Sequence, residues 1–228
     1  MSDNINLKIP QHILSTKSNS LDVSLLQDKI IVGFLGYARS GKDTLGSVLV
    51  DRYSFKRIAF GDILKQELNL HFKEAAMVDL KNKGTNINIE DIDFLNPKTQ
   101  GIKETLRPYM IWLGEEVRRV ASKYYWINKA FSEIGNNNKI IITDVRRDDE
   151  VDIFANTSFK SLLVHINQYG LSDADELTIR AIRKAQELWL FKHTIFVDSR
   201  IQNTGNLRQI HIENHINSLV EKFPEYFH

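Results

Sequence analysis

The chain contains no cysteine among its 228 residues. Disulfides, thiolate metal sites and thiol nucleophiles are therefore excluded. It also lacks an apolar run near the ~20 residues needed to span a bilayer, and its polar start, which carries Asp3, is unlike a secretory signal. Lys and Arg total 30 against 29 Asp and Glu, so we expect no bulk attraction to polymeric nucleic acid or a membrane. These absences predict a soluble, cytoplasmic globular protein.

The pattern of hydrophobic residues changes along the chain. Residues 1–28 are rich in Ser, Asn and Lys without a sustained period, which predicts an N-terminal extension. From 29 to 228, short apolar segments alternate with segments of helical period, which predicts one α/β domain with a doubly wound parallel sheet. The expected strands are 30–35, 57–60, 139–143, 162–166 and 194–197. The expected helices are 42–53, a helix capped by Asp62, 105–121, 126–134, 174–191 and 207–221, and the polar range 81–101 is expected to be a loop.

A phosphate-binding loop is predicted between the first strand and the first helix. Gly36 to Lys42 has the spacing G-x-x-x-x-G-K. Glycines let successive backbone N–H groups converge on phosphate oxygens, the helix N-terminus adds positive potential, and the lysine reaches the β- and γ-phosphates. The residues expected to bind the donor nucleotide here are Gly36, Ala38, Arg39, Ser40, Gly41, Lys42, Asp43 and Thr44. The alternative is a glycine-containing turn with a surface lysine.

Three residues near this loop are candidates to hold Mg²⁺. In a standard phosphate loop the lysine is followed by Ser or Thr, whereas here Asp43 comes first and Thr44 second. Asp43 could hold the metal, or it could act only by interacting favourably with the dipole of the helix whose first turn contains it. Asp144 follows a predicted strand, and a carboxylate at the carboxyl end of a parallel strand faces the ligand crevice.

Arginines gather at two places. Arg146 and Arg147 follow Asp144 directly, where guanidinium groups would stabilise transferred phosphoryl charge, although Arg147 could simply be solvated. The predicted helix 105–121 carries Arg107, Arg118 and Arg119 beside acidic residues, so ion pairs three or four residues apart are the alternative there. In the same helix, Trp112 is either a core residue or a base-stacking platform. Arg180 and Arg183 would form a solvated face.

Several sequence blocks, in this order, resemble the deoxynucleoside monophosphate kinases of tailed bacteriophages and prophages. The resemblance runs from about Lys29 to Val220. The blocks are the loop Gly36 to Thr44, Phe60-Gly61-Asp62-Ile63-Leu64-Lys65, Arg107 with Trp112-Leu113-Gly114, Glu116 and Arg118, Tyr125-Trp126-Ile127, Ile142 to Arg146 with Asp149-Glu150-Val151, and Asn203-Thr204-Gly205-Asn206-Leu207. The block Ser172 to Glu176 departs from the family pattern because it lacks a histidine.

This resemblance implies a P-loop kinase fold of the nucleoside monophosphate kinase type, with an acceptor-binding insertion at about 62–135 and a lid at about 167–191. It implies ATP as donor, Mg²⁺ as cofactor, and a deoxynucleoside 5′-monophosphate as acceptor. The catalytic residues would be Lys42, Asp144, Arg107 and Arg146. The acceptor would be bound by Asp62, Lys65, Arg107, Trp112, Glu116, Arg118 and Arg146, and the donor adenine would lie near Asn203 and Gly205. The location would be the host cytoplasm if the protein is phage-encoded.

Two other functions remain open from the sequence. One is another small-molecule kinase on the same scaffold, of the phosphomevalonate or dephospho-coenzyme A kinase type. The other is a nucleotide-binding regulator without turnover. A GTPase is disfavoured because Asn82-Lys83-Gly84-Thr85 lacks the aspartate that reads guanine. The expected partner is a small-molecule nucleotide, while the accepted base and the oligomeric state, including a homodimer, are left open.

Overall fold

The computed structural model describes residues 5, 7–15, 20–84, 100–168, 175–198 and 206–228. The chain divides into two compact units. The sheet unit comprises Asp22–Ala59 and Phe131–His228, and the helical unit comprises Met1–Leu21 and Phe60–Ala130. No helix in the described ranges is both long and apolar enough to cross a membrane.

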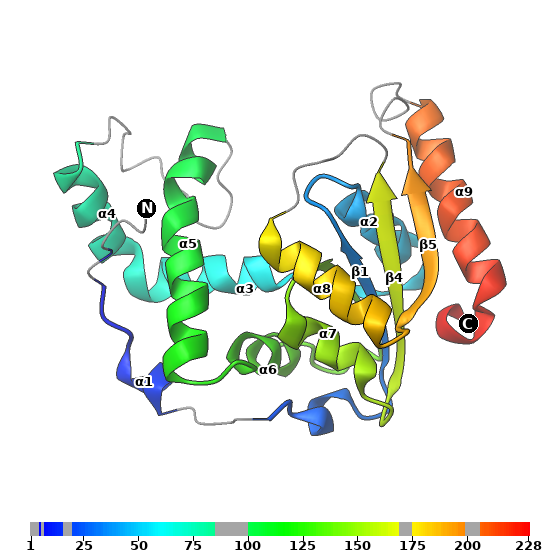
Figure 1. Ribbon diagram of the computed structural model, residues 1–228, viewed down its shortest axis with the longest axis horizontal. Coiled ribbons are helices and arrows are strands. Elements are labelled where there is room, and N and C mark those ends of the chain that lie inside the picture. Colours follow the sequence, from blue (N-terminus) through cyan, green and yellow to red (C-terminus); the bar gives the residue numbers. More distant parts are fainter. Residues whose placement is uncertain (1–4, 6, 16–19, 85–99, 169–174, 199–205) are drawn as a thin grey trace. The chain divides into compact units, whose positions relative to one another are not determined.

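The sheet unit contains a five-stranded sheet in the order β2-β3-β1-β4-β5. Figure 1 shows β1, β4 and β5 side by side. All four pairs of neighbouring strands are parallel. The strands are β1 (Ile30–Gly36), β2 (Lys56–Ile58), β3 (Lys139–Val145), β4 (Lys160–Gln168) and β5 (Phe191–Val197). The predicted doubly wound parallel sheet is thus confirmed, and the buried aliphatic runs of β1 and β3 follow from burial on both faces.

Helices cover both faces of this sheet. On one face α2 (Lys42–Tyr53) packs against β1, β2 and β3, and against α9 (Asn206–Lys222). On the other face α7 (Asp148–Ala155) packs against β4, and α8 (Glu176–Glu187) packs against α7 and β1. The chain enters the sheet after a short 3-10 helix (Val23–Leu26) and finishes with α10 (Pro224–Phe227). The sheet, α2 and α9 bury an apolar core that includes Phe34, Leu45 and Ile216.

The strand order fixes where a ligand crevice can form. β1 lies between β3 and β4, and the chain goes from β1 to β2 and β3 on one side before crossing to β4 and β5 on the other. The order of strands therefore reverses next to β1. In open α/β sheets, ligands bind outside the carboxyl ends of the strands at such a reversal. The segments that follow β1 and β3 are the ones placed there.

The helical unit is built from α1 (Gln11–Leu14), α3 (Phe60–Glu67), a π-helical turn (Leu68–Phe72), α4 (Lys73–Asn82), α5 (Gln100–Val120) and α6, which spans Tyr125–Ser132. The long α5 packs against α1, α3 and the π-helical turn. The indole N–H of Trp126 donates to the Gly114 carbonyl at 3.2 Å, and the Tyr109 hydroxyl donates to Asp79 at 2.5 Å. These bonds give the polar groups of Trp126 and Tyr109 hydrogen-bond partners within the packed unit, as buried polar groups require.

Three sequence expectations about the elements need correction. The helix expected to be capped by Asp62 begins earlier, at Phe60, so Asp62 lies in its first turn and pairs with Lys65 at 2.7 Å. The strand expected to reach residue 60 therefore ends at Ile58. The range 81–101 was expected to be a loop, but α4 continues to Asn82 and α5 begins at Gln100; residues 85–99 lie outside the described residues.

Candidate functional site

The loop Gly36 to Lys42 follows the carboxyl end of β1 and leads directly into α2. Gly41 precedes the helix with φ +90°, a conformation that side chains strongly disfavour. A Cβ on Gly36 would lie 2.0 Å from the carbonyl oxygen of Ile166 on neighbouring β4. Glycine is therefore needed at one end of the loop for its backbone conformation and at the other for space.

Lys42 is a buried cation held inside this loop. Its side chain, in a residue only 5 % exposed, donates to the carbonyls of Gly36 at 2.8 Å and Tyr37 at 2.6 Å. Burial, and next the positive charge of Arg146, lower the pKa of Lys42 from 10.5 to about 8, against the opposing pull of nearby carboxylates that include Asp144. An anion placed at the loop would therefore relieve an unfavourable environment for this charge.

The remaining loop residues have distinct environments. Ser40 is fully buried, and its N–H donates to the Tyr37 carbonyl at 3.2 Å. Arg39 is exposed and adopts a positive φ of 64°, which is uncommon for a residue with a side chain. Ala38 and Thr44 are half-buried, Thr44 in the first turn of α2. The strongly turned backbone around Arg39 to Gly41 is the kind that points N–H groups toward an anion.

Asp43 ties α2 to the sheet. Its Oδ1 accepts from the guanidinium of Arg57 on β2 at 3.0 Å and from the Thr143 hydroxyl on β3 at 2.8 Å. The close approach is possible because Gly46 faces Thr143, where a Cβ would lie 2.4 Å from the threonine methyl. Neither partner of Asp43 could be read from local sequence. This arrangement gives Asp43 a structural role, and a metal role for it stays a prediction.

Asp144 is the candidate metal ligand at the end of β3. The strand predicted to finish at Thr143 continues to Val145, so Asp144 is its second-last residue. The side chain is half-buried, and its charge acts on Lys42, which places it beside the phosphate loop. Mg²⁺ prefers oxygen ligands and keeps several waters. A partly exposed carboxylate beside a phosphate loop fits that preference.

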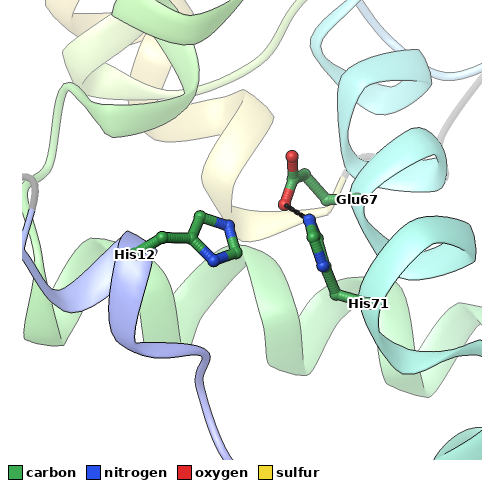
Figure 2. Close-up of side chains that lie close together, drawn as sticks. All are labelled: His12, Glu67 and His71. Carbon is green, nitrogen blue, oxygen red and sulfur yellow. Dashed lines mark ion pairs between the residues drawn. The ribbon is translucent and has the colours of Figure 1, made fainter.

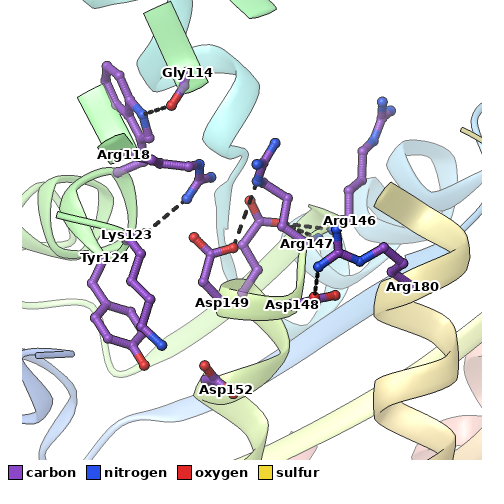
Figure 3. Close-up of polar contacts among 12 residues, drawn as sticks. Gly114, Arg118, Lys123, Tyr124, Arg146, Arg147, Asp148, Asp149, Asp152 and Arg180 are labelled. Carbon is purple, nitrogen blue, oxygen red and sulfur yellow. Dashed lines mark hydrogen bonds and ion pairs between the residues drawn. The ribbon is translucent and has the colours of Figure 1, made fainter. Parts of the chain in front are cut away.

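Arg146 and Arg147 follow Asp144 but differ in their partners. Glu150, which is 2 % exposed, accepts from the backbone N–H groups of Arg146 at 2.7 Å and Arg147 at 3.1 Å, so it fixes this corner (Figure 3). The Arg147 guanidinium lies 3.8 Å from Asp149. Within the described residues, the Arg146 guanidinium pairs with no carboxylate, and its charge acts on Lys42. Arg146 therefore adds a second cation to the loop site.

Part of the predicted lid is a helix of the sheet unit. The range 167–191 contains α8, where Arg180 pairs with Asp148 at 2.7 Å (Figure 3). Lys184 donates to the Asp148 carbonyl at 2.7 Å. Arg183 is exposed, and Asp175 caps the helix by accepting from the Thr178 N–H at 2.9 Å. Residues 169–174 and the predicted adenine contacts Asn203 and Gly205 lie outside the described residues. A lid role for this range stays a prediction.

The predicted acceptor residues other than Arg146 belong to the helical unit, where several are engaged with neighbours. Lys65 pairs with Asp62, and Arg107 lies 3.7 Å from Glu104 with both side chains exposed. Glu116 pairs with Arg119 at 3.0 Å, and Arg118 donates to the Lys123 carbonyl at 3.0 Å (Figure 3). Trp112 packs edge-on against Phe72, with ring centroids 5.6 Å apart. All of these contacts lie within the helical unit, and none of them shows that these residues bind a ligand.

Comparisons with known proteins were made by sequence and by structure. No protein family matches the chain, and no curated protein does. Among solved structures, shikimate kinase from Bacteroides thetaiotaomicron is similar over 84% of this chain and 98% of its own, at 12% identity and a TM-score of 0.37. A sugar kinase from Janibacter is similar over 84% of this chain and 94% of its own, at 14% identity and a TM-score of 0.31. Likenesses of this size carry no argument about activity.

Proposed function

We propose that the protein transfers the γ-phosphoryl group of ATP to the phosphate of a deoxynucleoside 5′-monophosphate, giving ADP and the deoxynucleoside diphosphate. The observation that carries the phosphoryl-transfer part is the buried Lys42 in its glycine-bounded loop, with Asp144 and Arg146 beside it. Two cations and one carboxylate at the carboxyl ends of β1 and β3 form an arrangement suited to a metal-bound polyphosphate.

The donor phosphates would be held by the loop backbone and by Lys42. The N–H groups of the loop backbone donate hydrogen bonds to anions, and the N-terminus of α2 adds a positive electrostatic potential. Lys42 would exchange its bonds to the Gly36 and Tyr37 carbonyls for bonds to phosphate oxygens. Because burial has lowered the pKa of Lys42, an anionic partner stabilises its charged form.

Mg²⁺ would be held by Asp144, and by Thr44 or Asp43 if either side chain turns toward it. When bound, the ion neutralises charge on the phosphates. An oxygen of the acceptor phosphate attacks the γ-phosphorus while the bond from that phosphorus to the β,γ-bridging oxygen breaks, and ADP leaves. Arg146 would stabilise the negative charge on the transferred group. Positioning and electrostatics do most of this work, so no strong base is required.

The acceptor is argued from the family resemblance alone. That resemblance assigns Arg107 and Arg118 to the acceptor phosphate, and Asp62 and Lys65 to its placement. Glu116 and Trp112 would complete the acceptor site. The contacts of Lys65 with Asp62 and of Glu116 with Arg119 would then have to adjust when the acceptor binds.

The test is a coupled ADP-release assay with purified full-length protein and Mg²⁺. The acceptors are the common deoxy- and ribonucleoside monophosphates, together with phosphomevalonate and dephospho-coenzyme A. A Lys42→Ala preparation measured in parallel controls for contaminating kinases. We expect ADP release that depends on at least one deoxynucleoside monophosphate, and dTMP and dGMP are the first acceptors to test.

Each result of this assay bears on a different part of the proposal. Turnover of phosphomevalonate or dephospho-coenzyme A alone would overturn the acceptor and keep the phosphotransfer chemistry. Binding of ATP without acceptor-dependent turnover would favour the regulator. Equal ADP release by the Lys42→Ala preparation would mean that the measured activity does not come from the phosphate loop of this protein.

A further inference from the structure

Two histidines and a glutamate converge in the helical unit, and none of the three is among the residues assigned above. They are His12 on α1, Glu67 at the end of α3, and His71 in the π-helical turn (Figure 2). One ligand atom from each residue lies within 4.8 Å of the other two. The two imidazole rings lie with their centroids 4.6 Å apart and their planes tilted by 50°.

The Glu67 carboxylate is the unusual member of this cluster. Glu67 is only 2 % exposed, and its Oε1 is held by the Lys129 ammonium at 2.7 Å. Its Oε2 is buried, makes no hydrogen bond, and lies 3.6 Å from the His71 Nε2. A buried carboxylate oxygen without a hydrogen bond is costly unless a cation supplies the missing interaction. This oxygen points into the space between the two imidazoles (Figure 2).

Two segments of the backbone position the three side chains. Glu67 and His71 are four residues apart, so they share one face of the helix, and the π-helical turn begins directly after Glu67. Such turns are rare and are frequent at functional sites. His12 is held in place by its neighbour Ile13, which is fully buried, and by packing of α1 on α5. The third ligand therefore comes from the N-terminal segment.

The donor set selects a class of ion. Two imidazoles and one carboxylate suit zinc and similar divalent transition ions, whereas Mg²⁺ and Ca²⁺ prefer oxygen ligands alone. Bonds of 2.0–2.2 Å in a tetrahedral site place ligand atoms roughly 3.4 Å apart, and Glu67 Oε2 and His71 Nε2 already stand at 3.6 Å. His12 and His71 are exposed, so their rings can move to close the site. The hydrogen bond from Lys129 would orient the ligating carboxylate.

We propose that His12, Glu67 and His71 bind one zinc-type divalent transition ion, with water in a fourth position, and that this ion fastens the N-terminal segment to the helical unit. The site is separate from the Mg²⁺ of the proposed reaction, which needs oxygen ligands from the sheet unit. Its predicted effect is on stability and on the N-terminal segment, so its test does not depend on finding an acceptor.

The experiment uses untagged, full-length protein stripped of metal by a chelator and then dialysed. Zn²⁺ is added for calorimetry and thermal unfolding, and Co²⁺ for absorption spectra that report coordination geometry. We expect a high-affinity ion at this site and a Tm increase of about 5–10 °C at ~100 times the dissociation constant. Hydrogen exchange should slow at residues 11–15 when Zn²⁺ is present. Mg²⁺ should reproduce none of these effects.

The variants are chosen to keep the fold. His12→Asn and His71→Asn change exposed residues, and each should weaken Zn²⁺ binding by about 100-fold or more. The matched control is His211→Asn with His215→Asn, because the Nε2 atoms of these two residues on α9 lie 3.1 Å apart and offer another place for an ion. This control should retain the Tm increase and the protection of residues 11–15. Zn²⁺ binding that survives His12→Asn but is lost in the α9 control would overturn the proposal, as would no binding at all.

Discussion

The lysines of the helical unit and the two cations at the phosphate loop differ in their partners. In the helical unit, Lys65, Lys83 and Lys129 each stand within 3.0 Å of a carboxylate oxygen of Asp62, Asp79 or Glu67. In the sheet unit, Arg57 and Arg180 are paired in the same way. Within its described residues, Lys42 and Arg146 have no carboxylate at ion-pair distance, and their charges act on each other. A paired cation is satisfied within the fold. A buried cation beside another cation is stabilised when an anionic ligand binds. We therefore expect phosphate to bind at the loop that holds Lys42.

Removing the loop lysine should give the largest effect. Lys42→Ala should lower turnover by at least ~10²-fold, the scale of losing a preorganised charge contact, while the protein stays folded. The matched control is Lys83→Ala, which removes a lysine paired with Asp79 in the helical unit and should leave turnover within about twofold. ADP-release kinetics and circular dichroism measure both variants. Near-normal turnover in a folded Lys42→Ala protein would contradict this distinction between the loop cations and the paired lysines.

The adjacent arginines offer a second matched pair. Arg146→Ala should lower kcat by about 10- to 100-fold because a guanidinium near the transferred charge is lost. Arg147→Ala should change kcat little, since Arg147 lies near Asp149 instead. Arg146→Lys keeps the positive charge but cannot form bidentate hydrogen bonds, so the kcat of this variant should still be reduced. A loss of Tm without a change in kcat for Arg146→Ala would make this residue structural.

Local patterns predicted the sheet unit well. The aliphatic segments of β1 and β3, and the glycine-bounded loop with its lysine, are contiguous in sequence, so their geometry could be inferred. The pairing of Asp43 with Arg57 and Thr143 could not, because it depends on the close packing of α2 on β3 at Gly46.

The helical unit was harder to predict for the same physical reason. Asp62 has the residue type of a cap, but α3 begins two residues before it and the carboxylate pairs with Lys65. Glu67 and His71 are near neighbours in sequence, whereas His12 reaches them only through the docking of α1. Contacts between distant segments have no local signature.

Substitutions at two glycines, one in each unit, test how closely the surrounding residues pack. Gly36→Ala would place a methyl group 2.0 Å from the Ile166 carbonyl oxygen, so β1 or β4 must shift. We expect a loss of about 1–3 kcal/mol in the free energy of unfolding, the usual cost of overpacking. In α5, Gly114→Ala meets only the Leu64 side chain at 3.6 Å and should be neutral or stabilising by up to about 1 kcal/mol. Urea unfolding measures both, and equal effects would contradict the close approach at Gly36.

The pH dependence of donor capture should report Lys42. Its pKa is lowered to about 8 by burial and next by Arg146, so the cation that binds phosphate is present below that pH and lost above it. Therefore kcat/KM for ATP should fall as pH rises through about 8, approaching tenfold per pH unit. Lys42→Arg, although less active, should lack this decline because arginine stays charged. Arg146→Ala should move the decline to higher pH, and an unmoved decline would mean that another group titrates.

The smallest effect is expected at Glu116, where a structural and a functional interpretation can be separated. The pKa of Glu116 is lowered, first by its hydrogen bond with Arg119, so its contribution to stability is present above the unfolded pKa and lost as pH falls through the folded one. Because the Arg119 side chain is 70% exposed, Glu116→Gln should shift Tm at pH 7 by no more than about 2 °C, with the difference vanishing in acid. If Glu116 also contacts the acceptor, as the resemblance implies, the same variant should raise the acceptor KM several-fold while the KM for ATP stays constant. An unchanged acceptor KM would mean that Glu116 has only a structural role, as the ion-pair partner of Arg119.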